Sequence, residues 1–95
     1  MKQLPIYNLL DLSTAHIKKE TDNFLRGQVE EDFPEVIVYL KTCGYFILVP
    51  DDDIDDLEIP NDLKDCLKFA KENNCVWLVL DDGAEVVDDL KQYEW

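Results

Sequence analysis

Two apolar runs separated by a single glycine constrain the fold of this chain most. Residues 36–43 and 45–49 are rich in β-branched and aromatic side chains, which favour strands. Gly44 is the only clear break between the runs, so we expect a tight antiparallel hairpin. Pro50 should end the second strand, because proline has no N–H to donate to a sheet. The chain must therefore build a sheet that contains an antiparallel pair.

The segments before and after this hairpin predict a helix each. An apolar run at 6–12 is interpreted as a first strand, and helical spacing then indicates a short helix over 18–26 that ends at Gly27. A second helix is predicted over 61–73, with Asn61 as its N-cap and Asn73 and Asn74 at its end. Its apolar stripe has the spacing i, i+3, i+4, i+7 and consists of Leu63, Cys66, Leu67 and Ala70.

The last third of the chain predicts two more strands. Residues 75–80 are continuously apolar, as in a strand covered on both faces. Asp82 and Gly83 form a hairpin turn signal before a final strand at 85–87. The expected order is β-α-β-β-α-β-β, an α+β fold with a mostly antiparallel or mixed sheet and two helices packed on one face. A chain of 95 residues should form one domain, 1–95.

The charge of the chain restricts its partners. It has 22 acids and 9 bases, a net charge of −13. Residues 1–48 carry 7 acids and 5 bases, whereas residues 49–95 carry 15 acids and 4 bases, so the negative charge is concentrated in the second half. We expect no direct binding to nucleic acid or to anionic membranes. No stretch reaches the about 20 apolar residues of a membrane span, and no signal peptide is evident, so a cytoplasmic location is expected.

Acids from two segments of the second half are predicted to form one partner-binding patch. Alternate residues of a strand are about 6.6 Å apart, comparable to neighbouring phosphates of a nucleic acid strand. An acidic surface of this kind can therefore enter a basic groove as nucleic acid does. The predicted partner-binding residues are Asp51, Asp52, Asp53, Asp55, Asp56, Glu58, Asp62, Asp65, Asp81, Asp82, Glu85, Asp88 and Asp89.

The same acids resemble a calcium loop only in part. Asp51, Asp53 and Asp55 match the first three ligand positions of an EF-hand. Asp56 stands where the loop needs glycine, and Asp62 replaces the bidentate glutamate. We therefore expect no specific metal site and no cofactor.

His16 and the cysteines offer no catalytic motif. His16 is the only histidine and stands close to Ser13 and Thr14, but adjacent residues seldom point toward one another, so we interpret it as a turn or helix-capping residue. The three cysteines form no C-x-x-C pair and are interpreted as reduced packing residues: Cys43, Cys66 and Cys75. No catalytic residue is predicted.

Three motifs together resemble a known family. They are the start Leu12–Ile17, the central Gly44–Phe46 and the end Tyr93–Trp95. The chain resembles small uncharacterised proteins of bacterial conjugative elements and phages, which share a Ser-Thr-Ala-His-Ile-like start and a Tyr-Asp-Trp-like end. Here Glu94 replaces the usual aspartate. The resemblance implies an accessory protein of a mobile element and carries no catalytic or ligand-binding positions.

These observations favour a non-enzymatic interaction protein. Our leading hypothesis is an inhibitor that binds a host nucleic-acid-binding defence protein by mimicking nucleic acid. Three alternatives remain open: an ordinary solvated acidic surface, an antitoxin-like neutraliser of a basic protein, and a small enzyme that uses His16. The oligomeric state is not predicted.

Overall fold

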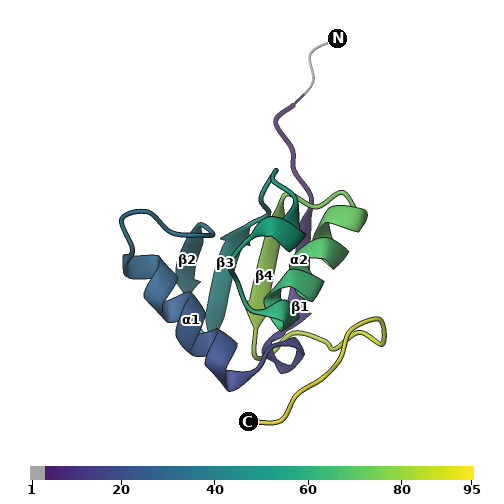
Figure 1. The fold of residues 1–95 in the computed structure, drawn as a ribbon. Helices are drawn as coiled ribbons and strands as arrows, with labels where there is room; N and C mark the ends of the chain where they lie inside the picture. Colours follow the sequence, from purple (N-terminus) through teal and green to yellow (C-terminus); the bar gives the residue numbers. More distant parts are fainter. Residues whose placement is uncertain (1–3) are drawn as a thin grey trace.

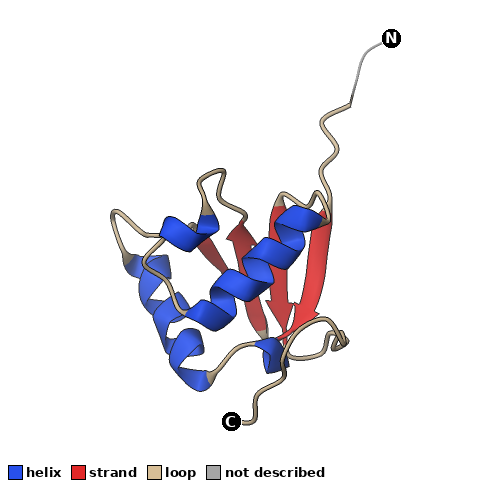
Figure 2. Cartoon of the chain, turned by 45° about the vertical axis from the view of Figure 1, so that its right-hand side comes forward, coloured by secondary structure: helices blue, strands red, loops and turns tan. Residues whose placement is uncertain are grey.

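The sheet has four strands and carries both helices on one face. The computed structural model describes residues 4–95, with strands β1 (Leu9–Ser13), β2 (Val38–Lys41), β3 (Gly44–Leu48) and β4 (Trp77–Asp81). The strand order is β1-β4-β3-β2, with β1 parallel to β4 and the other pairs antiparallel. Helices α1 (Lys19–Glu30) and α2 (Asn61–Glu72) lie over the same side of the sheet (Figures 1 and 2). The predicted α+β class and mixed sheet are confirmed.

The core lies between this sheet face and the helices. Alternate strand residues point inward, and the register places Leu12 beside Leu80 and Leu80 beside Tyr45. The helices close the core with side chains that are completely buried, among them Leu25 of α1 and Leu63 of α2. Burial of apolar side chains of this size contributes about 1.5–3 kcal/mol each. The alternating pattern of the strands thus fixes which sheet face the helices cover.

Two short 3₁₀ turns join these elements. Turn η1 (Thr14–His16) follows β1 directly, and the Ser13 hydroxyl caps it by accepting a hydrogen bond from the Ala15 N–H. Turn η2 (Ile54–Asp56) interrupts the acidic loop before α2, and its Ile54 is buried in the core. An apolar anchor therefore holds a loop that is otherwise charged.

The predicted final strand at 85–87 is wrong. The two sides of β4 are already occupied, by β1 on one side and β3 on the other. The chain after the turn at Asp82 and Gly83 therefore has no free edge of β4 to pair with, and it runs on as an irregular C-terminal tail. β1 contacts this segment through the Ser13 N–H, which donates to the Glu85 carbonyl (3.3 Å).

Several predicted boundaries also shift. Helix α1 continues past Gly27 to Glu30, because this glycine has ordinary helical geometry and Val29 beyond it packs against the core. Asn61 is the first residue of α2 rather than its N-cap, a position that Pro60 occupies without a side-chain bond. Asn74 adopts the left-handed conformation (φ 59°) expected after a helix.

Gly44 is required by a close approach of two strands rather than by the turn. The left-handed position of the hairpin turn is taken by Cys43 (φ 64°). Gly44 is already the first residue of β3, and a Cβ built there would lie 1.8 Å from the Leu80 carbonyl oxygen of β4. A backbone atom cannot move aside as a side chain would. Any larger residue must therefore separate β3 from β4.

We expect Gly44→Ala and Gly27→Ala to change stability in opposite directions. Gly44→Ala should lower the free energy of unfolding by about 1–3 kcal/mol or more through strain. Gly27→Ala should raise it by about 1 kcal/mol, because a Cβ there meets nothing within 4 Å and alanine favours a helix. Urea unfolding measures both. Equal effects of the two substitutions would contradict the close approach at β4.

Candidate functional site

The acidic loop between β3 and α2 is held by three lysines of the helix. Lys64, Lys68 and Lys71 follow one another at i, i+4 and i+7 along α2. Lys64 donates to the Asp55 carbonyl (3.0 Å), and Lys71 donates to the carbonyls of Asp51 (3.3 Å) and Asp52 (3.0 Å). Lys68 forms an ion pair with the Asp55 carboxylate. The lysines thus bind mainly the backbone of the loop.

This arrangement leaves most loop carboxylates directed to solvent. All six acids of residues 51–58 are exposed. Within residues 4–95, Asp55 is the one loop acid with an ion-pair partner, and Lys68 holds the pKa of its carboxyl below the usual value. Asp53 accepts a hydrogen bond from the Asp55 N–H and so caps η2. The loop backbone is therefore held in place while most of its carboxylates stay exposed.

The tail brings a further acid to the other side of α2. A shallow hollow there is lined by Asp65, Lys68 and Glu72 of the helix and by Asp89 and Lys91 of the tail, around Phe69 and Leu90. A second hollow on the loop side shares Lys68 and Glu72 with the first and is also lined by Asp53 and Lys71. We call the exposed loop acids together with the acids of these two hollows the acidic ridge, and its members are Asp51, Asp52, Asp53, Asp55, Asp56, Glu58, Asp65, Glu72 and Asp89. Sequence reasoning missed Glu72, although its exposed position on the helix could have indicated it.

Two predicted acids lie elsewhere, beside the β2–β3 turn. Asp81 forms an ion pair with Lys41 and accepts from the Gly83 N–H, and these bonds hold the pKa of its carboxyl below the usual value. The Asp82 N–H donates to the Cys43 carbonyl (3.1 Å). The two predicted acidic segments therefore do not form one patch throughout. Glu85 and Asp88 are exposed on the tail.

Asp62 has an internal role. It is only 6% exposed, and its carboxylate accepts hydrogen bonds from the Lys18 N–H and the Thr21 hydroxyl, both at 2.7 Å. These bonds join the start of α2 to the start of α1. Asp62 is therefore not presented to a partner, in contrast to its expected place in the patch.

His16 fastens the tail to the domain. Its ring is buried, its Nε2 accepts from the Val87 N–H (3.0 Å), and its Nδ1 lies 2.8 Å from the Lys91 carbonyl. Because Nε2 accepts, the proton belongs on Nδ1, which donates to Lys91. Two more bonds hold the tail, from the Tyr93 N–H to Ala15 (2.7 Å) and from the Trp95 indole to Ile17 (2.8 Å). Neither ring nitrogen of His16 is free for general-base chemistry.

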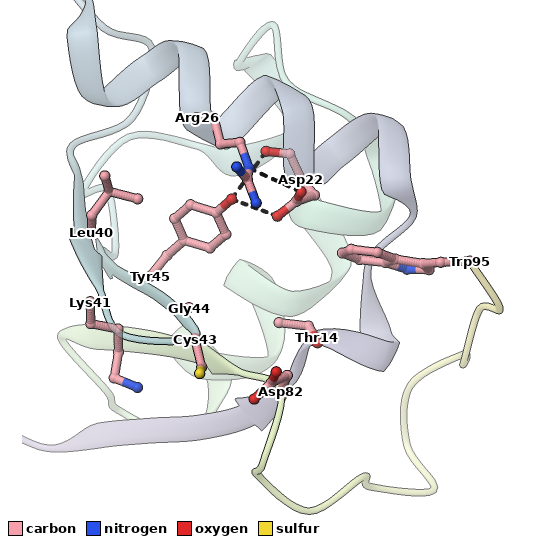
Figure 3. Close-up of a pocket in the computed structure, with 10 residues that line it drawn as sticks. All are labelled: Thr14, Asp22, Arg26, Leu40, Lys41, Cys43, Gly44, Tyr45, Asp82 and Trp95. Atoms are coloured by element: carbon pink, nitrogen blue, oxygen red, sulfur yellow. Dashed lines mark hydrogen bonds and ion pairs between the residues drawn. The ribbon is translucent and has the colours of Figure 1, made fainter.

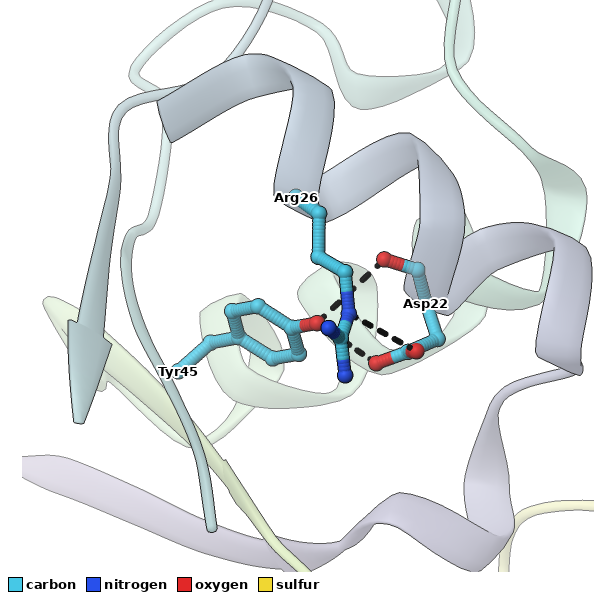
Figure 4. A network of polar contacts seen from close by, with 3 residues as sticks. All are labelled: Asp22, Arg26 and Tyr45. Carbon is cyan, nitrogen blue, oxygen red and sulfur yellow. Dashed lines mark hydrogen bonds and ion pairs between the residues drawn. The ribbon is translucent and has the colours of Figure 1, made fainter. Parts of the chain in front are cut away.

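A buried polar group behind the sheet edge was not predicted. The Tyr45 hydroxyl of β3 donates to the Asp22 carboxylate of α1 (2.5 Å), and Arg26 one turn later donates to the same carboxylate (3.2 Å) (Figure 4). Burial, and then the bond to Asp22, raise the pKa of Tyr45 to about 12. Tyr45 was read only as part of an apolar strand, because its partner is 23 residues away.

This group forms one wall of an open pocket of about 260 Å³. Thr14, Cys43 and Asp82 approach it from the side of the β2–β3 turn, and the Trp95 indole approaches from the tail (Figure 3). The pocket is lined by two acids, Asp22 and Asp82, and by two bases, Arg26 and Lys41. The pocket therefore shows no clear preference for an anion or a cation.

The three cysteines that we interpreted as packing residues differ in exposure. Cys66 is buried, and burial raises the pKa of its thiol to about 12. Cys75 is half-buried, whereas Cys43 is exposed on the β2–β3 turn. Within residues 4–95, no cluster of histidine, cysteine and carboxylate side chains is placed to hold a metal ion, and no helix is long and apolar enough to cross a membrane.

Fold and surface together define a small α+β domain with an acidic ridge along one helix. Residues 9–95 match the model of a family described as "Family of unknown function (DUF5983) C-terminal domain". Because this match covers nearly the whole chain, the chain belongs to that family. Comparisons with curated proteins and with solved structures return no match.

We expect the stability contribution of Tyr45 to depend on pH. Between about pH 10 and about pH 12 the unfolded chain loses the phenol proton while the folded chain keeps it, so the free energy of unfolding falls as pH rises through this window. Tyr45→Phe should remove this part of the decline and cost about 1–2 kcal/mol at neutral pH. Urea unfolding at several pH values measures both effects. Tyr39→Phe is the control at a concentration where the chain is monomeric, because it removes the hydroxyl of an exposed ring and no buried hydrogen bond.

We expect His16→Ala to release the tail. The substitution removes two hydrogen bonds and leaves the Val87 N–H without its acceptor, so it should lower the free energy of unfolding by about 2 kcal/mol. Amide hydrogen exchange should also become faster at Val87 and Tyr93. Gln92→Ala, on an exposed tail residue, is the control. Unchanged protection at Val87 would show that His16 does not hold the tail.

Proposed function

We propose that this domain is a non-enzymatic binding module whose acidic ridge enters a basic groove of a protein partner. The observation that supports the proposal is the use of the α2 lysines. They donate to carbonyls of the loop and not chiefly to its carboxylates, so the loop is fixed while its negative charge remains available. A preorganised loop loses less conformational entropy on binding than a mobile one.

The partner best suited to this ridge binds nucleic acid in its free state. Lysine and arginine side chains that contact phosphates also attract a dense group of carboxylates, since both are anionic oxygen groups. The ridge acids lie on a loop, a helix and a tail, so the expected spacing along a strand does not describe them. Mimicry would therefore rest on charge density more than on a regular repeat.

The resemblance to proteins of conjugative elements and phages suggests the biological setting. An accessory protein of a mobile element benefits if it blocks a host defence protein that acts on nucleic acid. We therefore propose that the domain inhibits such a protein by occupying its nucleic-acid groove.

Affinity capture from a bacterial lysate tests this function. A nucleic-acid-processing protein should bind the domain at low salt, be released at about 0.5 M salt, and be displaced by excess DNA duplex, because counterions and phosphates compete for the same cations. A captured protein that stays bound at high salt and is not displaced by the DNA duplex would contradict nucleic-acid mimicry.

Two matched variants locate the binding surface. Neutralising Asp51, Asp52, Asp56 and Glu58 to their amides should abolish capture. Neutralising Glu30, Glu31, Asp32 and Glu35 changes the net charge equally at the end of α1 and should leave capture largely intact. Equal losses in both variants would show that overall charge, and not the ridge, attracts the partner.

A further inference from the structure

The face of the sheet opposite the helices is apolar and open. The register places Leu9, Trp77, Leu48, Phe46 and Tyr39 on this side, spread over all four strands. Leu9, Tyr39, Phe46 and Trp77 line one shallow hollow of about 360 Å³, with the rings of Tyr39 and Trp77 6.1 Å apart. No helix of residues 4–95 covers this face (Figure 2). We call it the open face.

The open face carries far less charge than the rest of the molecule. Alternation along the strands gives it three charged side chains, Asp11, Asp81 and Lys41, of which the last two form an ion pair. The whole chain has a net charge of −13. Two copies that meet through their helical sides would bring their acidic ridges together, which is strongly unfavourable. The open face is the surface on which two copies can meet with little repulsion.

An apolar arm leaves the domain beside this face. Residues 4–7 lead away from the body before β1 (Figure 1) and contain Leu4, Ile6 and Tyr7, which are 71%, 77% and 67% exposed, whereas the Asn8 carbonyl already accepts from the Val76 N–H. Four residues reach at most about 13 Å when extended, somewhat less than a five-residue strand of the sheet. Three large apolar side chains exposed to solvent next to one another are typical of a surface that becomes buried in a complex.

We propose that two copies of this chain pair through their open faces, with each arm packing against the partner copy. A two-fold axis brings the same patch of both copies together, so each apolar face supplies the surface that the other lacks. Stacked sheets lie about 10 Å apart, a distance that interlocking side chains such as Trp77 and Tyr39 fill. The acidic ridges then point away from the interface on both sides.

The area of the face explains why the arms are needed. The width of the face is set by four strands about 4.8 Å apart, and its length by five residues of about 3.3 Å each. The face therefore measures roughly 300 Å² in projection. Stable complexes bury about 800 Å² on each partner. The open face alone falls short, and the arm adds apolar area at the edge where β1 begins. The pairing therefore depends on both parts.

Sedimentation velocity of the full chain from about 5 to about 500 µM tests the pairing. The chain should show a concentration-dependent dimer that persists or strengthens at about 0.5 M salt, because salt screens the repulsion between acidic copies. This salt response is opposite to that of the proposed basic partner, so the two proposals can fail separately. A monomer over the whole range would overturn the pairing.

Neighbouring residues on β2 give a matched control. Tyr39 points to the open face, and Leu40, which is 63% exposed, points to the opposite side. Tyr39→Glu should weaken the dimer by roughly 30-fold or more, and Leu40→Glu should not. Replacing Leu4, Ile6 and Tyr7 by serine should weaken the dimer without changing the urea midpoint at a concentration where the chain is monomeric. Equal dimerisation of Tyr39→Glu and Leu40→Glu, or a dimer unaffected by the arm substitutions, would overturn the proposal.

Discussion

The pairing of β4 with both β1 and β3 is the constraint on which the rest of this structure depends. β4 is hydrogen-bonded to a neighbour on each side and is covered by α2 on one face, whereas its continuous apolar sequence predicts cover on both faces. β3 reaches it so closely that only glycine fits at Gly44. Because both edges of β4 are used, the C-terminal segment cannot form a hairpin with β4.

The course of the tail follows from this exclusion. Residues after Gly83 do not pair with β4, so most of their backbone groups need partners outside the sheet. His16 and the η1 turn supply several of them, through Val87, Lys91 and Tyr93. The start and end motifs of the sequence, 12–17 and 93–95, therefore meet in space, and Trp95 bonds to Ile17. Their distinctive residues serve one contact between the two ends of the domain.

The fold also separates charge from apolar surface. The helical side carries the acidic ridge, whose lysines stabilise the loop backbone, whereas the open face carries aromatic side chains and few charges. A single sheet with helices on one side always leaves the other face uncovered by its own elements. In this chain the uncovered face is apolar, and this explains why it is a candidate interface distinct from the ridge.

The sequence by itself determined most of the secondary structure elements and the negative charge of the surface. Periodicity predicted both helices, the β2–β3 hairpin and the buried strand, because hydrophobic spacing depends on neighbouring residues alone. Composition alone determined the excess of acids. The boundary at Gly27 was wrong, since packing of Val29 outweighs the weak helix preference of one glycine.

Only the tertiary structure decided which distant groups meet. The place of β1 beside β4 excluded the final strand, and the contact of Asp62 with Thr21 buried an acid that looked available. The Tyr45–Asp22 bond likewise joins residues from different elements. Such contacts depend on how helices and strands pack in three dimensions, and the residue pattern along the chain does not encode that arrangement locally.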